Sequence, residues 1–169
     1  MRFASTILLS AALLFGCTRE PAPPPAASAQ AAPTPPVPTQ PEGHLRLIPA
    51  PDYPNAAMVI ADQLAQSESA HRRLLVYVGA PWCEPCQHFH KAAEAGELDA
   101  VFPDLDLLVF DSERDNVRLF QAGYVSKYIP LFVVPNPDGR SSGKHIEGGI
   151  KGDGAVKQLT PRLKELLGN

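Results

Sequence analysis

Two cysteines separated by two residues are the side chains best suited to chemistry in this sequence. Cys83 and Cys86 stand in the segment Trp82-Cys83-Glu84-Pro85-Cys86, directly after an apolar run and a Gly-Ala-Pro break. A pair with this spacing can form a small disulfide ring. It can also supply two of the four ligands of a structural zinc site. Because the sequence has no second C-x-x-C, reversible thiol–disulfide chemistry is favoured over metal binding.

Histidines close to the pair leave one alternative open. On a helix, Cys86 and His90 share a face whereas His88 points elsewhere, so a single four-ligand site is awkward. Copper binding by Cys83, Cys86 and a nearby histidine remains the alternative function, and it predicts tight Cu(I) binding with little disulfide reduction. No resident metal or cofactor is predicted, and no G-x-G-x-x-G fingerprint occurs. The remaining histidines are expected to be solvated: His44, His71 and His145.

The elements around the pair explain how the chain could activate it. Residues 74–78 are five consecutive apolar residues, which indicates a buried strand, and residues 84–95 suit a helix that ends at Gly96. The pair then lies at a helix N-terminus, whose free N–H groups and partial positive charge stabilise a Cys83 thiolate. Pro85 is tolerated in the first turn of such a helix.

The rest of the folded part alternates between strand and helix patterns. Strands are expected at 45–48, 105–110, 131–134 and 145–147, and helices from Pro54, near 113–122 and in the tail. Asp111 or Ser112 is expected to cap the helix near 113–122. Thr160-Pro161 is expected to interrupt or restart the tail helix. This order predicts an α/β fold with a central mixed sheet of four to five strands flanked by helices, ending in an antiparallel hairpin.

At these residues the chain resembles the thioredoxin superfamily, over roughly residues 50–168. The resemblance rests on Trp82-Cys83-x-x-Cys86 after an apolar strand and on Tyr128-Ile129-Pro130-Leu131-Phe132. It implies a thioredoxin-like fold, a redox-active Cys83–Cys86 disulfide and a cis bond before Pro130. It also implies substrate contacts from Trp82, Ile129 and Pro130, and tuning of the pair by Glu84 and Pro85.

Two subfamilies fit this resemblance. The Cys-Glu-Pro-Cys motif looks like that of membrane-tethered reductants of the cytochrome c maturation group. The stretch 88–104 looks equally like the C-terminal domain of transmembrane thiol-reductant conduits.

One position departs from the thioredoxin pattern. Thioredoxins carry a buried acid in the strand before the motif, where this chain has Tyr77. The proton of the resolving cysteine must therefore go elsewhere, with Glu84, His88 and His90 as the nearby candidates. Glu84 also opposes thiolate formation slightly, which favours a reductant role.

The first 43 residues predict export and tethering. Residues 1–16, with Arg2 and a short apolar run, fit a signal peptide and are too short to span a bilayer. Leu14-Phe15-Gly16-Cys17 resembles the lipobox of bacterial lipoproteins, which implies lipidation of Cys17. Residues 17–43 are Pro/Ala-rich and predict a disordered linker, and residues 44–169 the thioredoxin-like domain. Thus the expected location is the bacterial cell envelope, lipid-anchored on its periplasmic or extracytoplasmic face.

Composition narrows the class of partner. The net charge of −3 and the absence of a long basic run argue against nucleic acid. We expect a monomeric oxidoreductase that reduces protein disulfides and receives electrons from a membrane or exported donor. A scaffold with a vestigial cysteine pair is the third class considered.

Overall fold

A computed structural model describes residues 43–168 of the chain. The signal peptide, the lipidated Cys17 and nearly all of the linker lie outside the described residues, so these assignments stay predictions. Among the helices that are described, none combines the length and the apolar character needed to cross a membrane.

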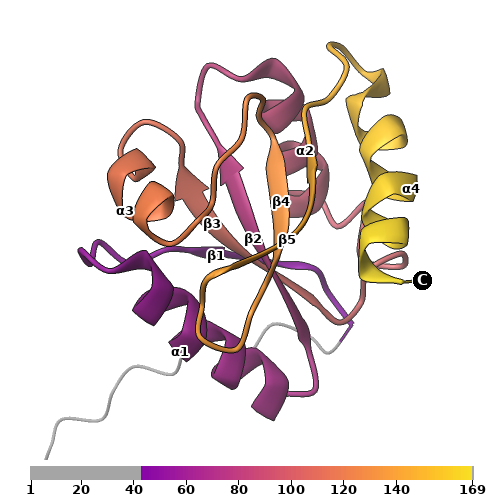
Figure 1. The fold of residues 1–169 in the computed structure, drawn as a ribbon. Helices are drawn as coiled ribbons and strands as arrows, with labels where there is room; N and C mark the ends of the chain where they lie inside the picture. Colours follow the sequence, from indigo (N-terminus) through magenta and orange to yellow (C-terminus); the bar gives the residue numbers. More distant parts are fainter. Residues whose placement is uncertain (1–42, 169) are drawn as a thin grey trace, which may run out of the picture. The chain divides into compact units, whose positions relative to one another are not determined.

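The described chain forms five strands and four helices around one mixed sheet (Figure 1). The sheet order is β1-β3-β2-β4-β5; β1, β3 and β2 run parallel, whereas β4 and β5 are antiparallel to their neighbours. This confirms the predicted α/β fold with its mixed sheet and closing hairpin. The strands are β1 Arg46–Pro49, β2 Arg73–Gly79, β3 Leu105–Asp111, β4 Leu131–Pro135 and β5 Ser141–Glu147; the helices are α1 Ala56–Ser69, α2 Glu84–Glu94, α3 Asn116–Gln121 and α4 Gly154–Leu167.

Side chains of the central strand β2 alternate between two apolar layers. Leu74, Val76 and Val78 pack with α1 and α3 on one face, and Leu75 and Tyr77 pack with α2 and α4 on the other. Figure 1 shows the two helix pairs on opposite sides of the sheet. A strand buried on both faces reads as an unbroken apolar run, which is why residues 74–78 were recognisable in the sequence.

Helix α4 corrects one expectation. It runs without interruption from Gly154 to Leu167, with Pro161 inside it. Proline removes one backbone N–H from the helical ladder. Here the Thr160 hydroxyl donates to the Val156 carbonyl at 2.8 Å, and Leu159 and Leu163 are fully buried against the sheet. Burial of this apolar face outweighs the missing hydrogen bond and keeps the helix continuous.

Helix α3 is shorter than expected and begins at Asn116. Asp111 does not cap it; one Asp111 carboxylate oxygen accepts the N–H groups of Glu113 and Arg114, both at 2.9 Å. The first part of the expected helix is therefore a separate turn. Buried Asp115 follows this turn and pairs with Arg118, which fixes where the helix starts.

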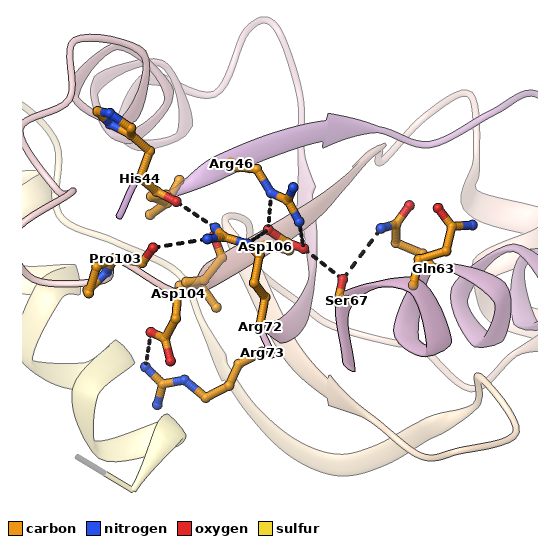
Figure 2. A network of polar contacts seen from close by, with 12 residues as sticks. His44, Arg46, Gln63, Ser67, Arg72, Arg73, Pro103, Asp104 and Asp106 are labelled. Atoms are coloured by element: carbon orange, nitrogen blue, oxygen red, sulfur yellow. Dashed lines mark hydrogen bonds and ion pairs between the residues drawn. The ribbon is translucent and has the colours of Figure 1, made fainter. Parts of the chain in front are cut away.

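A buried ion cluster secures the entry of the chain into the sheet (Figure 2). The fully buried Asp106 carboxylate accepts from Arg46, Arg72 and Ser67, at 2.5–2.7 Å. Arg72 also donates to the His44 carbonyl, which lies just before β1. These bonds join β1, β3 and the end of α1.

His44 corrects another expectation. It is half-buried rather than solvated, and its imidazole contacts the carboxylate of Asp99. The same carboxylate accepts the backbone N–H of Leu45 at 3.0 Å. His44 therefore helps to hold the first described residues against the loop after α2.

Candidate functional site

The two cysteines of the motif are joined where β2 ends and α2 begins. Their sulfurs are 2.00 Å apart and their Cα atoms 5.2 Å apart. Cys83 is the N-cap of α2, and its sulfur accepts the backbone N–H of Cys86 at 3.3 Å. A helix N-terminus favours negative charge at this position, so the site is built to hold Cys83 as a thiolate when the disulfide opens.

Access to the pair is restricted. Cys83 and Cys86 are 4% and 3% exposed, and they pack with Ala80 and Ile129. Trp82, immediately before the pair, is 64% exposed, so its indole is accessible to an approaching molecule. A reacting molecule must therefore approach the sulfur of Cys83 closely, past the exposed side chains beside it.

The loop before β4 supplies the residues expected to contact a substrate. The Ile129–Pro130 peptide bond is cis, as the sequence predicted. Pro130 is buried, and its carbonyl accepts the N–H of Gly148 at 2.8 Å. Because Ile129 packs on the cysteine cluster, the structure brings the two distant parts of the motif together.

Glu84 and Pro85 occupy the first turn of α2. Glu84 is exposed, and its carboxylate accepts the N–H of Gly152 at 3.0 Å. Pro85 is buried, and a Cβ added at Gly149 would lie 3.1 Å from its own Cβ. Both residues therefore connect the head of α2 to the loop before α4, and the charge of Glu84 is fixed beside the pair.

Tyr77 is the residue expected from the sequence to stand in place of a buried acid. It is 2% exposed, and its hydroxyl donates to the Cys86 carbonyl at 3.4 Å. Burial raises the pKa of the Tyr77 phenol well above its ordinary value, so the phenol stays neutral. Tyr77 also stacks on Phe132, with ring centroids 4.8 Å apart. It supports the core behind Cys86 and does not accept its proton.

The two histidines of α2 have separate acidic neighbours. His88 Nδ1 lies 3.8 Å from a carboxylate oxygen of Asp153, and His90 Nδ1 lies 3.3 Å from one of Glu94. Within residues 43–168, no group of three or more histidine, cysteine or acidic side chains is placed to hold a metal ion.

An apolar groove beside the pair was not foreseen from the sequence. It has a volume of about 750 Å³ and contains five large apolar side chains that are more than 60% exposed. These are Trp82, Val117, Phe120, Val125 and Tyr128. Val117 and Phe120 lie on α3, three residues apart and facing outward. Two apolar residues at this spacing were the signal in the sequence that could have indicated the groove. Ile129 lines the same groove, which therefore reaches the redox pair.

Solved structures that are similar to this chain include two thioredoxins. Thioredoxin O1 from Arabidopsis thaliana in the oxidized state is 16% identical, with a TM-score of 0.44, over 72% of this chain and 96% of that one. Thioredoxin from Trypanosoma brucei brucei is 14% identical, with a TM-score of 0.41, over 78% of this chain and 97% of that one. No family model and no curated protein sequence matches.

Strand order and site together define the class of protein. The five-stranded mixed sheet carries a bonded cysteine pair at the head of α2, next to a cis-proline loop. The described domain therefore has a thioredoxin-like α/β fold that carries a disulfide at a helix N-terminus.

Proposed function

We propose that the protein is an exported, membrane-tethered thiol–disulfide oxidoreductase that reduces disulfides in other proteins. The observation that carries the proposal is the Cys83–Cys86 disulfide at the N-terminus of α2, with the Cys83 sulfur already accepting a helix N–H. In the reduced protein, the Cys83 thiolate attacks a client disulfide and forms a mixed disulfide. Cys86 then attacks Cys83, releases the client as a dithiol and restores the ring. Two electrons from an exported or membrane donor complete the cycle.

The charge at the site supports the proposed reductant role. Glu84 places a carboxylate in the first turn of α2, held there by the Gly152 N–H. Its negative charge destabilises a Cys83 thiolate and so favours the disulfide over the dithiol. A couple whose disulfide is favoured has a low reduction potential and acts as a reductant.

The apolar groove defines the client chemistry. We assign it to an extended apolar segment flanking the client disulfide, because the groove is continuous with Ile129 beside the pair. Exposed apolar surface of this kind marks sites of protein contact. Phe120→Ser should lower kcat/KM several-fold for a protein client and leave the rate with glutathione disulfide unchanged. Met58→Ser, at an exposed apolar residue outside the groove, is the matched control. If Phe120→Ser lowered the rates with the protein client and with glutathione disulfide equally, the groove would have no role in binding the protein client.

Redox titration of the Cys83/Cys86 couple against glutathione tests the central proposal. We expect insulin disulfides to be reduced, Cys83→Ser to abolish the activity, and Cys86→Ala to accumulate a mixed disulfide with the client. Tight Cu(I) binding by the reduced protein without disulfide reduction would support the copper alternative instead. A protein inert in both assays would support the scaffold class.

The tether is tested separately on the full chain. We expect radiolabelled fatty acid to be incorporated in a bacterial host and to be lost in Cys17→Ser, with the protein then released from the membrane fraction. Membrane retention of the unlabelled variant would contradict lipid anchoring through Cys17.

A further inference from the structure

Cys86 lines a cavity of its own, away from the apolar groove. The cavity has a volume of about 350 Å³ and shares none of its lining residues with the groove. It contacts Cys86 but not Cys83. Its polar lining comes from Tyr77 on β2, from Gln87 and His90 on α2, and from Asp111 and Arg114 at and just after the end of β3. Cys86 thus lines a cavity with several polar side chains, and Cys83 does not line it.

Resolution of a mixed disulfide requires Cys86 to lose its proton. A thiolate is the attacking species, and a thiol in largely buried, apolar surroundings ionises poorly. Cys86 is 3% exposed, and the neutral Tyr77 hydroxyl is bonded to the Cys86 carbonyl. A base that reaches the cavity is therefore needed.

His90 is the residue placed to be that base. It lies one turn after Cys86 on α2, so the two side chains are neighbours on one helix face. Its imidazole lines the cavity, with its ring centroid 6.5 Å from that of Tyr77. One turn further on, Oε1 of Glu94 lies 3.3 Å from Nδ1 of His90. This contact favours a proton on Nδ1 and leaves the lone pair on Nε2.

We infer that His90 accepts the proton of Cys86 during resolution and that Glu94 holds the imidazole in the required tautomer. The inference rests on the proposed function. The cavity is large enough for water to bridge the two groups. As the proton moves from the Cys86 thiol to Nε2 of His90, the Cys86 sulfur bonds to the Cys83 sulfur. The bond from Cys83 to the client sulfur breaks, the client leaves as a thiolate, and the imidazolium releases its proton to solvent.

Three charged side chains lie near the imidazole. Glu94 contacts it, and Asp111 and Arg114 line the same cavity. Arg114 is itself paired with Asp115 at 2.9 Å, which limits its effect. Of the other candidates named from the sequence, Glu84 is bonded to Gly152, and neither Glu84 nor His88 lines the cavity.

The test separates the two chemical steps. Reduced protein is mixed with an aromatic disulfide whose thiol absorbs visible light, and stopped-flow records two thiol releases. The first release reports attack by Cys83 and the second reports resolution by Cys86. In the wild type, His90 should speed the second phase by acting as a general base. His90→Gln should slow this phase at pH 7 by about tenfold or more and leave only the ionisation of the thiol itself.

His88→Gln is the matched control, on the same helix and similarly exposed but outside the cavity. It should keep both rates within about twofold of the wild type. Glu94→Gln, on the exposed end of α2, should also slow the second phase because it removes the carboxylate that orients the imidazole, and it keeps the test decisive if His90→Gln does not fold. Second-phase rates unchanged in His90→Gln, or unchanged in Glu94→Gln, overturn the role of His90. Failure of the wild type to release the first thiol instead overturns the proposed function.

Discussion

Replacing Asp106 with asparagine tests whether the buried ion cluster stabilises the fold. The carboxylate accepts two hydrogen bonds from Arg46, one from Arg72 and one from Ser67. An amide keeps one oxygen and turns an NH₂ group toward donors, and it leaves Arg72, whose side chain is 12% exposed, without a countercharge. Breaking a buried pair in this way costs about 3–5 kcal/mol, a large part of the roughly 5–15 kcal/mol that holds such a domain folded.

The matched control is Asp104→Asn, two residues earlier. Asp104 pairs with Arg73 at 3.0 Å, and both side chains are about one-third to one-half exposed, at 46% and 31%. A pair this exposed contributes about 0–1 kcal/mol. Urea denaturation of the oxidised proteins, followed by far-ultraviolet circular dichroism, gives both free energies of unfolding. If Asp106→Asn and Asp104→Asn lowered the free energy of unfolding by amounts within about 1 kcal/mol of each other, the stabilising role of the buried cluster would be refuted.

Low pH should remove the contribution of Asp106 to the free energy of unfolding. Burial raises its pKa, but the hydrogen bonds from Arg46, Arg72 and Ser67 reverse this and hold the pKa below its ordinary 3.8. A carboxyl with a lowered folded-state pKa contributes stability above the unfolded value, and this is lost as pH falls through the folded value. The difference between wild type and Asp106→Asn should stay constant from pH 7 to 5 and narrow below 3.8. If this difference in stability already decreased between pH 7 and 5, the lowered pKa of Asp106 would be contradicted.

Four further substitutions have defined expectations. Gly139→Ala should destabilise the domain by about 3 kcal/mol or more in urea denaturation, because φ is +76° and the new Cβ would lie 1.9 Å from the Ala57 carbonyl oxygen. Gly143→Ala, with φ +80° and nothing within 4 Å, should cost only about 1–2 kcal/mol, and equal losses would refute the steric argument. Tyr124→Phe should cost about 1–3 kcal/mol in the same assay, since its buried hydroxyl donates to the Gly139 carbonyl at 2.9 Å, and no change would contradict this. Glu84→Gln should raise the reduction potential in glutathione titration by about 10–20 mV, and a lowered potential would reverse the proposed effect of its charge.

Sequence patterns identified the parts of the fold that depend on local composition. The apolar runs of β2, β3 and β4 are buried on both faces, so each was recognisable without knowledge of its neighbours. Strand β5 was recognised only at 145–147, although it starts at Ser141. Its first residues are polar and glycine-containing, and they are extended because β4 pairs with them, for example Pro135 with Ser141. Pairing with β4 therefore makes the first residues of β5 extended, although their own sequence does not favour a strand.

The same distinction applies to the site. The cysteine pair and Pro130 carry their chemistry in residue type and spacing, and the predicted cis bond is present. The apolar groove depends on α3 lying beside the loop at 125–129, which no local pattern encodes. Asp106 likewise appeared as one charge in an apolar strand, because its partners Arg46 and Arg72 come from two other segments.

The chain enters its domain at the amino ends of the parallel strands, whereas the disulfide lies at their carboxyl ends. Arg46 lies opposite Asp106, near the amino end of β3, whereas Cys83 follows the carboxyl end of β2. From Leu74, paired with Asp106, to Gly79 the strand advances about 16 Å. A pull on the residues upstream would load β1 in shear along β3, with the Arg46–Asp106 bonds among the first to bear the force.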